Sequence, residues 1–488
     1  MALASVLRGA HLARVLDKWQ STRGPGGARL PEYAALADAV RGLIRDGRIS
    51  LGVRLPAERE LAGALGVSRT TVTAAYRELR TSGHLASRRG AGSWSALPPG
   101  QRISTSGMWL PVDEHAVIDL GFAALAAPPQ LAAAAAEALE ELPRYAGGAG
   151  YHPSGLTPLR EAVASRFTAR GVPTRPDQIM ITNGVQHAVD LLLRLTVSPG
   201  QSVLVESPTY PNMIAALRAH RTRVVTDNLG PLTGWEPETL LGSIRAGRPT
   251  LAYLIPDFHN PTGHLMPAPL REQIVAAAHR AGTDLVIDES FVDLPALGVA
   301  PLPPVASFDR HARVLTVGGM TKPYWGGLRI GWIRAPAPVI ARLAAVRVTV
   351  DTAGPVLDQL VAVRLLERSD EILPSRWAQL TSQRDALVAA LHRHLPAWTV
   401  PVPPGGMSLW VELDAPVSTA LAHAAMAHGV RLAPGPRFGV DGTLERYVRL
   451  PFTLPATDLV EVARLLEIAA ADLDRARPAP WTTPVLVT

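Results

Sequence analysis

The sequence predicts a protein of several domains, in which a small helical module precedes a larger α/β body with a mostly parallel sheet. Three observations support this prediction. The chain has 488 residues, which is too long for one ordinary domain. Residues 1–96 carry 15 Lys and Arg against 7 Asp and Glu, a net charge of +8, whereas the remaining residues carry −2. Beyond residue 118, short apolar runs alternate with Ala- and Leu-rich stretches, as in parallel strands joined by helices.

The composition excludes several kinds of site. The chain has no cysteine, so disulfides, thiolate metal sites and cysteine nucleophiles are excluded, we expect no metal centre, and a cytoplasmic location is expected. No run of about 18 strongly apolar residues occurs, and the apolar residues 131–139 are too few to span a bilayer. The N-terminus lacks the basic start of a signal peptide.

The first two helices of the basic module are predicted within residues 31–66. Apolar residues from Tyr33 to Ile44 recur at helical spacing, and Gly47 is placed to end that helix. A second, shorter helix begins near Pro56, and Gly66 makes the turn after it.

A third helix follows directly after this turn. Ser68 is placed to cap it, Val72, Tyr76 and Leu79 form its inward face, and Gly83 follows its end. Two helices joined by a short glycine-bearing turn form a helix-turn-helix.

The start of the third helix carries polar side chains that suit contact with DNA. They are Ser68, Arg69, Thr70, Thr71 and Thr73. Short hydroxyls and an arginine reach phosphates and base edges when a helix N-terminus enters the major groove.

Residues 84–94 predict a β-hairpin after the third helix. Gly90 and Gly92 permit a tight turn, and Arg88 and Arg89 can reach the DNA backbone or the minor groove. The excess positive charge of the module agrees with a polyanionic partner, and a solvated basic surface is the alternative.

Residues 32–96 resemble the winged helix-turn-helix of GntR-type bacterial transcription regulators. The resemblance rests on residues 52–62, 66–72, 76–79 and 87–93. It implies that Arg54, Arg59, Arg69, Arg88 and Gly90 contact DNA. Ala57 departs from the family pattern, where serine is common, and this removes one phosphate contact. A winged helix used only for protein contacts is the alternative.

The body is predicted to begin after a linker. Residues 97–118 contain turn formers without periodicity, and residues 1–30 form an N-terminal extension of unknown purpose. Apolar runs predict strands at residues 202–205, 251–255, 284–288 and 313–317, with helices on both faces of their sheet. Ligand groups gather at the C-terminal ends of such strands.

Polar motifs stand at three of these positions. Gly184, Val185 and Gln186 precede a helix, so their backbone N–H groups can hold a phosphate, although an ordinary glycine turn is the alternative. Asn260 lies in a stiff Pro-containing loop after a strand. Asp288 ends another strand, where a buried carboxylate needs a cation such as a pyridinium nitrogen or a structural ion-pair partner.

Lysine is almost absent from the chain. Only Lys18 and Lys322 occur, although Lys and Arg together number 48. A primary amine forms an imine with an aldehyde such as pyridoxal phosphate, whereas arginine stays protonated. We interpret Lys18 as a surface charge and Lys322 as the reactive amine, with chance survival in a surface loop as the alternative.

Residues 119–488 resemble the class I/II aminotransferases of fold type I, which depend on pyridoxal 5'-phosphate (PLP). The matching segments are residues 151–160, 182–186, 206–211, 259–263, 288–291, 321–322 and 327–331. The resemblance implies a large domain with a mostly parallel sheet and a smaller α+β domain.

The same resemblance implies a role for each motif residue. Lys322 forms the Schiff base with PLP, Asp288 pairs with the pyridine nitrogen, Asn260 bonds the ring 3-hydroxyl, and Tyr210 stacks on the ring. Arg449 matches the arginine that grips an amino acid's α-carboxylate, a bidentate task suited to guanidinium. The implied phosphate ligands are Gly184, Val185, Gln186, Thr321 and Arg329, with Tyr151 from a second subunit.

Three positions depart from the aminotransferase pattern. Phe291 stands where a tyrosine commonly bonds the 3-hydroxyl, Gly319 stands where a phosphate-binding serine is common, and Pro323 follows the lysine directly. None of them prevents imine formation, but they weaken the case for efficient turnover because the cofactor is less tightly placed.

A GntR-type module joined to an aminotransferase-like body resembles the MocR subgroup of bacterial regulators. The predicted domains are residues 1–30, 31–96, 97–118 and 119–488. The resemblance implies a homodimeric transcription regulator that binds operator DNA and senses PLP itself or an effector that bears an amino group. A working aminotransferase with an appended DNA-binding module is the alternative, and a cofactor-free scaffold is the third interpretation.

Overall fold

The computed structural model describes residues 7–16, 19, 30–45, 49, 53–88, 92–96, 98, 118–230, 232–440 and 442–476. The chain divides into two compact units. The first unit contains Met1–Asp119, Glu412–Val448 and Val462–Thr488, and the second contains Leu120–Val411 and Arg449–Glu461.

The first unit begins with the predicted helices and hairpin. Its elements are α1 (Gly9–Val15), α2 (Glu32–Arg45), α3 (Glu58–Leu65), α4 (Arg69–Thr81), β1 (Leu85–Arg88) and β2 (Gly92–Ser95). Helix α4 contacts α2, α3 and β1. The inward positions Val72, Tyr76 and Leu79 are buried, as the periodicity predicts.

Local chemistry fixes where α4 begins. Gly66 ends α3 in the left-handed conformation, at φ 68°. The Ser68 Oγ then accepts a hydrogen bond from the backbone N–H of Thr71 at 3.0 Å, which confirms the predicted cap. The Tyr76 hydroxyl donates to the carbonyl of Pro56 at 2.9 Å and ties α4 to the segment before α3. The predicted stop at Gly47 and the hairpin residues Arg89 and Gly90 lie outside the described residues.

The C-terminal part of the chain supplies a smaller α+β region. Strand β3 (Ile118–Asp119) pairs in parallel with β13 (Val430–Arg431). A three-stranded sheet has the order β12-β15-β14. The bounds of the remaining elements here are β12 (Ser408–Glu412), α14 (Ser418–Ala427), β14 (Ala433–Pro434), β15 (Tyr447–Pro451) and α15 (Ala456–Ala476).

The second unit is built on an eight-stranded sheet of order β4-β11-β10-β9-β8-β5-β6-β7. The strands β10, β9, β8, β5 and β6 run parallel, and β11 is antiparallel to both of its neighbours. The sheet is therefore mostly parallel, and all four predicted strands are confirmed. Their bounds are β4 (Ile179–Thr182), β5 (Ser202–Ser207), β6 (Arg223–Gly230), β7 (Gly234–Trp235), β8 (Leu251–Leu254), β9 (Asp284–Asp288), β10 (Val314–Gly319) and β11 (Gly331–Arg334).

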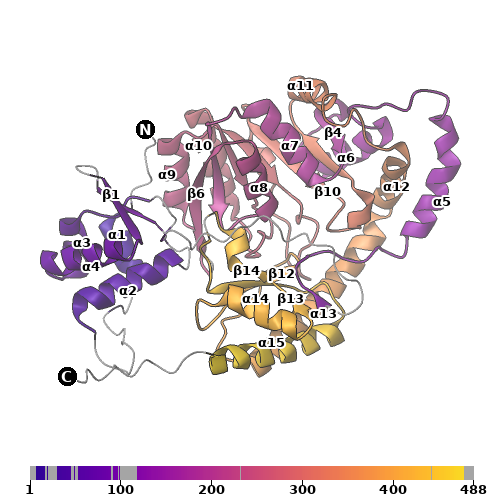
Figure 1. The fold of residues 1–488 in the computed structure, drawn as a ribbon. Coiled ribbons are helices and arrows are strands. Elements are labelled where there is room, and N and C mark those ends of the chain that lie inside the picture. Colours follow the sequence, from indigo (N-terminus) through magenta and orange to yellow (C-terminus); the bar gives the residue numbers. More distant parts are fainter. Residues whose placement is uncertain are drawn as a thin grey trace. The chain divides into compact units, whose positions relative to one another are not determined.

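Helices cover both faces of this sheet (Figure 1). The connection from β5 through α8 to β6 runs in one direction across the sheet, and the connection from β8 through α10 to β9 runs in the other. Because such crossovers are right-handed, α8 and α10 lie on opposite faces. Helix α7 contacts α8, and α9 contacts α10. The helices of this unit are α5 (Leu131–Glu141), α6 (Thr157–Ala169), α7 (Val185–Thr196), α8 (Pro211–Ala219), α9 (Pro237–Gly247), α10 (Ala268–Ala281), α11 (Ala337–Arg347), α12 (Val356–Glu367) and α13 (Ser369–His394).

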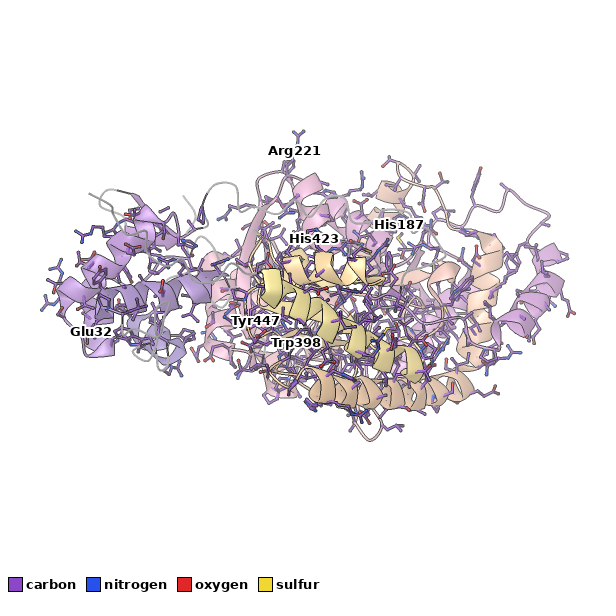
Figure 2. All side chains as sticks on the ribbon, turned by 60° about the horizontal axis from the view of Figure 1, so that its bottom comes forward. Glu32, His187, Arg221, Trp398, His423 and Tyr447 are labelled. Carbon is purple, nitrogen blue, oxygen red and sulfur yellow. The ribbon has the colours of Figure 1, made fainter. Side chains whose placement is uncertain are left out.

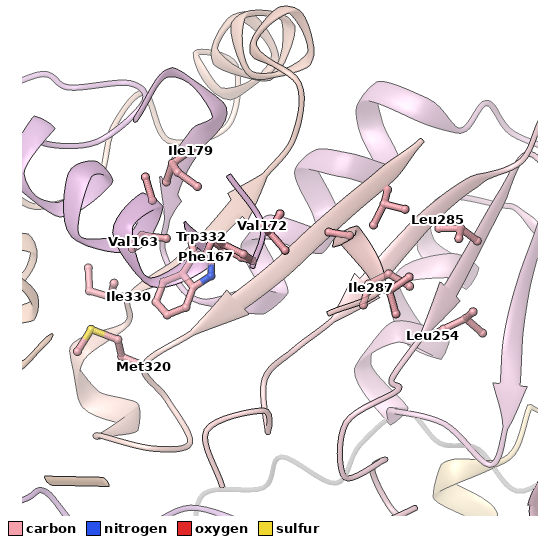
Figure 3. Packing of buried hydrophobic residues seen from close by; sticks show 14 of the residues in the cluster. Val163, Phe167, Val172, Ile179, Leu254, Leu285, Ile287, Met320, Ile330 and Trp332 are labelled. Atoms are coloured by element: carbon pink, nitrogen blue, oxygen red, sulfur yellow. The ribbon is translucent and has the colours of Figure 1, made fainter. Parts of the chain in front are cut away.

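The core lies between the sheet and its helices. Leu254, Leu285 and Ile287 are buried on adjacent central strands, and Phe167 of α6 lies near Trp332 of β11 (Figure 3). Strands covered on both faces have near-continuous apolar sequences, which is why these runs could be recognised.

Arg221 is exposed and projects from the turn between α8 and β6 (Figure 2). Among the described residues, no helix combines the length and apolar character that crossing a membrane requires.

Candidate cofactor site and DNA-binding surface

The amine of Lys322 lies just beyond the end of β10. Its Nζ donates a hydrogen bond to the carbonyl oxygen of Ala123 at 2.7 Å and lies 5.6 Å from the centre of the Phe291 ring. Removal from water, helped by the nearby charge of Arg449 and opposed by Asp288, lowers the pKa of Lys322 to about 8. The neutral, nucleophilic form is therefore more populated near neutral pH than in an ordinary lysine.

Asp288 is buried at the end of β9 and accepts two hydrogen bonds. The Tyr253 hydroxyl donates to Oδ2 at 2.5 Å, and the backbone N–H of Ser290 donates to Oδ1 at 2.8 Å. Burial raises the pKa of Asp288, while these hydrogen bonds and the Lys322 charge oppose the rise. A cation beside this carboxylate relieves the cost of its burial, so a protonated pyridine nitrogen fits here.

Tyr253 is a site residue that the sequence analysis missed. It lies fully buried in β8, and its hydroxyl reaches the carboxylate of Asp288 on the neighbouring strand. The available signal was a lone hydroxyl within an apolar strand, because buried tyrosine hydroxyls need a partner.

The start of α7 fits a phosphate group. Gly184 precedes the helix at φ 84°, and the N–H groups of Val185 and Gln186 open its first turn. The Arg329 Nη2 donates to the carbonyl of Asn183 at 3.0 Å. A Cβ at Gly184 would lie 2.9 Å from that nitrogen, so glycine lets the guanidinium approach the helix N-terminus. Thr321 is half-buried beside Lys322.

The packing around Gly319 explains why the proposed phosphate site lacks the usual serine. A Cβ at Gly319 would lie 2.9 Å from the carbonyl oxygen of Ile330 and 3.1 Å from Val185 Cγ2. The backbone packs too closely for a side chain here, so the helix N-terminus and Arg329 are left to hold an anion.

An ion-pair cluster holds the loop before Gly184. Arg347 is buried and donates to both oxygens of Asp351, at 2.8 and 3.1 Å. The Asn183 Nδ2 donates to Asp351 Oδ2 at 2.6 Å, and Arg347 also donates to the carbonyl of Pro153 at 2.9 Å. The sequence shows Arg347 and Asp351 only four residues apart, but Asn183 and Pro153 lie far from them in the chain, so the cluster as a whole has no local pattern.

Tyr210 lies among the charged groups of the site. Burial raises the pKa of Tyr210 to about 12, with Asp288 adding to the rise and Arg449 and Arg329 opposing it. The Tyr210 hydroxyl accepts a hydrogen bond from Asn212 Nδ2 at 2.9 Å. Asn260 is buried in the loop after β8.

Two predicted ligands have distinct surroundings. Arg449 is buried on β15, where its Nη2 donates to the carbonyl of Gly121 at 2.6 Å. Tyr151 is 69% exposed, so within one chain it does not line the buried cluster.

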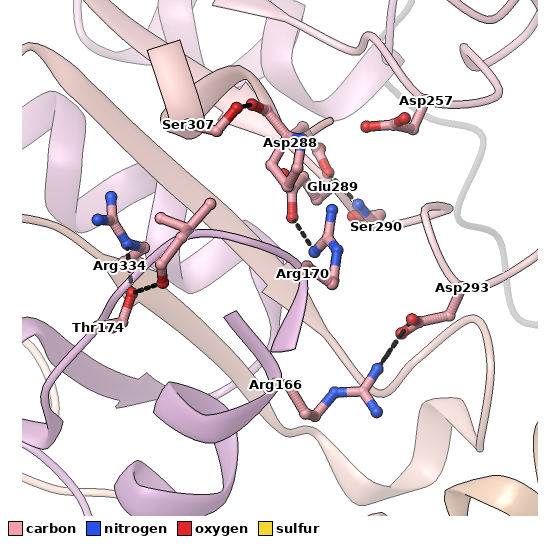
Figure 4. A network of polar contacts seen from close by, with 12 residues as sticks. Arg166, Arg170, Thr174, Asp257, Asp288, Glu289, Ser290, Asp293, Ser307 and Arg334 are labelled. Carbon is pink, nitrogen blue, oxygen red and sulfur yellow. Dashed lines mark hydrogen bonds and ion pairs between the residues drawn. The ribbon is translucent and has the colours of Figure 1, made fainter. Parts of the chain in front are cut away.

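Two ion pairs, in which only Glu289 is fully buried, fix the turn after Asp288 (Figure 4). Arg170, at the end of α6, lies 2.6 Å from Glu289 Oε2, and Arg166 lies 2.8 Å from Asp293. Burial raises the pKa of Glu289, while Arg170 opposes the rise. These pairs anchor both ends of the turn to one helix.

The predicted DNA contacts lie largely on the surface of the first module. Arg54, Arg59, Ser68, Arg69 and Thr70 are exposed, and Thr71 is half-buried. Arg69 is 72% exposed, with its Nε 3.9 Å from Glu58 Oε2.

Two features modify the predicted DNA surface. Arg54 forms a β-bridge with Trp94 and lies against Gly92, so it packs beside strand β2 of the hairpin. The hydroxyls of Thr70 and Thr71 lie 2.7 and 2.8 Å from Ser68 Oγ, which orients them around the cap. Arg88 is the last residue of β1, and Gly90 is outside the described part of the hairpin.

Comparison with known families agrees with this geometry. Residues 118–467 match the family described as aminotransferase class I and II. The chain belongs to this family. Residues 32–94 match the gntR family of bacterial regulatory proteins. An aminotransferase-family domain preceded by a GntR domain is the MocR-type architecture.

Two proteins named as regulators are similar to this chain over most of its length. The chain is 27% identical to the uncharacterized HTH-type transcriptional regulator YdfD of Bacillus subtilis, over 87% of this chain and 93% of the relative. It is 28% identical to the probable rhizopine catabolism regulatory protein MocR of Rhizobium meliloti, over 83% of this chain and 87% of the relative.

A solved aminotransferase structure matches the aminotransferase-family domain. The α-aminoadipate aminotransferase LysN of Thermus thermophilus, complexed with N-(5'-phosphopyridoxyl)-L-leucine, superimposes with a TM-score of 0.67 at 28% identity. The match covers 74% of this chain and 93% of that structure. The predicted fold type is confirmed.

Proposed function

We propose that the chain is a PLP-dependent, DNA-binding transcription regulator of the MocR type. The observation that carries the proposal is the combination, in one chain, of half-buried Lys322 and buried Asp288 with a capped, exposed helix N-terminus at α4. The gntR match and the named regulator relatives support the DNA-binding half. The aminotransferase match supports the PLP-binding half.

Each residue of the site has a task toward the cofactor. When bound, PLP supplies an aldehyde that condenses with amines and an electron-withdrawing ring. Lys322 would hold it covalently through its amine, and Asp288 would keep a proton on the pyridine nitrogen. Tyr210 and Asn260 would orient the ring. The phosphate would be held by Gly184, Val185, Gln186, Thr321 and Arg329.

Arg449 gives the effector its chemical class. A buried guanidinium binds a carboxylate through two parallel N–H donors, so an amine that also bears a carboxylate fits best, and PLP itself is the other candidate signal. Regulation requires the effector to bind two states of the protein with different affinities. We place the protein in the cytoplasm as a homodimer, with Tyr151 serving the partner's phosphate site.

A working aminotransferase with an appended DNA-binding module is the second candidate function. The close fold match to LysN favours it. Multiple-turnover transamination by the purified protein, at ordinary enzyme rates, would support this second function over a pure regulator.

The chain offers a matched control for testing the covalent link, because it has only two lysines. Borohydride reduction of the PLP-loaded protein should attach the cofactor at Lys322, as read by mass spectrometry. Lys322→Ala should lose both this attachment and the absorbance of the bound cofactor at the short-wavelength edge of the visible range, while it retains DNA binding. Lys18→Arg should keep all three properties. Attachment elsewhere, or none, would contradict the proposed site.

The DNA-binding half is tested separately. Arg69→Ala should weaken operator binding by about 1–3 kcal/mol if the arginine reads a base, and PLP binding should be unchanged. Unchanged operator affinity would show that α4 is not the recognition helix.

A further inference from the structure

Three buried or half-buried cations hold one short stretch of backbone at the start of the second unit. Arg449 Nη2 donates to Gly121 O at 2.6 Å, and Lys322 Nζ donates to Ala123 O at 2.7 Å. Arg376 Nη2 donates to Ala126 O at 2.6 Å. We call residues 121–126 the carbonyl segment.

The three bonds, together with two buried side chains, hold the carbonyl segment. It lies outside the helices and strands, although Ala123 and Leu125 are buried and Ala124 between them is exposed. Gly121 and Ala123 both present their carbonyl oxygens to cationic side chains of the proposed site.

Two of the three donors are the groups proposed to bind cofactor and effector. A neutral amine that condenses with an aldehyde forms a C=N bond, and its two hydrogens leave with the aldehyde oxygen as water. Lys322 then loses the donors that serve Ala123 O. A carboxylate that binds Arg449 in the bidentate mode takes two of its five N–H donors, and it competes with Gly121 O where Nη2 is one of them.

The third donor lies outside the proposed site. Arg376 also donates to the carbonyl of Tyr324 at 3.2 Å and is buried. Its bond to Ala126 O does not compete with cofactor or effector, so this end of the carbonyl segment stays fixed.

We propose that the carbonyl segment is an internal competitor for the cofactor and the effector, which release it at Gly121 and Ala123 while Ala126 remains the anchor. In sequence, only Asp119 and Leu120 separate the segment from residues 97–118, which join the DNA-binding module to the aminotransferase domain. The inference rests on the proposed function, since it uses the same two ligands.

The chain lacks cysteine, so one introduced thiol reports on the segment alone. A nitroxide on Ala124→Cys of the full-length protein should show restricted motion in its electron paramagnetic resonance spectrum before ligand is added. PLP should raise the mobile fraction several-fold. Pyridoxamine phosphate has no aldehyde to consume the amine, so it should raise the mobile fraction much less. A nitroxide on Pro129→Cys, beyond the anchor, should not respond.

Variants test the same contacts without a cofactor. Lys322→Ala should mobilise the Ala124 label before any ligand is added, whereas Lys322→Arg retains a donor and should mobilise it less. Propionate should raise the mobile fraction of the Ala124 label above its value without ligand, whereas propionamide, which has no carboxylate, should not. Arg449→Met should abolish this difference between propionate and propionamide.

The outcomes separate this inference from the proposed function. If absorbance shows PLP bound at Lys322 but the Ala124 label stays restricted, the competitor role is wrong and the proposed regulator stands. If PLP does not bind while Lys322→Ala still mobilises the label, the contact is real and the proposed cofactor is wrong. A label that is mobile in the ligand-free protein overturns the inference outright.

Discussion

At the scale of single residues, two aromatic side chains surround the proposed reactive groups. Phe291 offers only its ring to the Lys322 amine, at 5.6 Å, whereas the Tyr253 hydroxyl bonds the Asp288 carboxylate at 2.5 Å. Of these two side chains only Tyr253 has a hydroxyl, and it supports Asp288, the carboxylate that would face the pyridine nitrogen. This arrangement favours stable holding of PLP over rapid turnover, because less of the bonding is directed at the ring's 3-hydroxyl.

The capture of PLP by the ligand-free protein should depend on pH through Lys322. Only the neutral amine attacks an aldehyde, so the rate should rise with pH about a midpoint near 8, whereas an ordinary lysine has a pKa of 10.5. Stopped-flow absorbance measures this rate. Arg449→Met removes a neighbouring positive charge and should move the midpoint upward, whereas Arg449→Lys should move it less. An identical midpoint in all three proteins would contradict the assigned cause.

At the scale of elements, helix α4 combines folding and recognition in one residue. Ser68 caps the helix through the N–H of Thr71, yet it also stands at the surface proposed to meet DNA. A serine can serve both tasks because it accepts from the backbone without adding negative charge near phosphates.

Two substitutions at Ser68 should separate these tasks. Ser68→Ala removes the cap and should destabilise the module by about 1 kcal/mol, seen as faster hydrogen exchange of the α4 amides. Ser68→Asp keeps a capping oxygen, so exchange should stay slow while DNA affinity falls through repulsion of phosphates. Equal effects of both substitutions on both measurements would argue against the dual role.

The ion pair between α6 and the residue after β9 should matter for stability. Arg170→Met leaves the buried Glu289 carboxylate without its partner and should lower the free energy of unfolding by about 3 kcal/mol in denaturant titrations. Adding Glu289→Gln should recover part of the loss. Arg175→Ala breaks an exposed pair with Asp177 and should cost less than about 1 kcal/mol.

At the scale of the whole molecule, positive charge is concentrated in the first 96 residues, at +8, and the rest of the chain carries −2. Such an asymmetry directs a polyanion to one module and leaves the aminotransferase domain free for small ligands. The division of labour between the two domains is thus visible in the charge as well as in the folds.

Operator affinity should fall steeply with salt, because bound phosphates release counterions. Arg59→Ala should make the slope of log affinity against log salt shallower by about 1. Arg221→Ala, on the exposed surface of the second unit, should leave the slope unchanged. A slope that responds to Arg221 and not to Arg59 would place the DNA elsewhere.

The strands, the α4 cap and the types of residue at the site could be predicted from the sequence, because each has a local pattern. Apolar runs identified β5, β8, β9 and β10, and Ser68 followed a turn glycine. The contact between Lys322 and Ala123 O spans 199 residues, and that between Arg449 and Gly121 O spans 328. A backbone carbonyl has no side-chain signature, so only the fold reveals such partners.

The end of β9 places two acidic residues side by side with different partners. Asp288 meets Tyr253, whereas Glu289 meets Arg170. Because side chains alternate along a strand, inserting one residue into β9 would turn Asp288 toward the surroundings of Glu289, and deleting one would turn Glu289 toward those of Asp288. The length of β9 is therefore more strongly constrained than the identity of its residues. Directed-evolution libraries of this protein should substitute residues in β9 without inserting or deleting any.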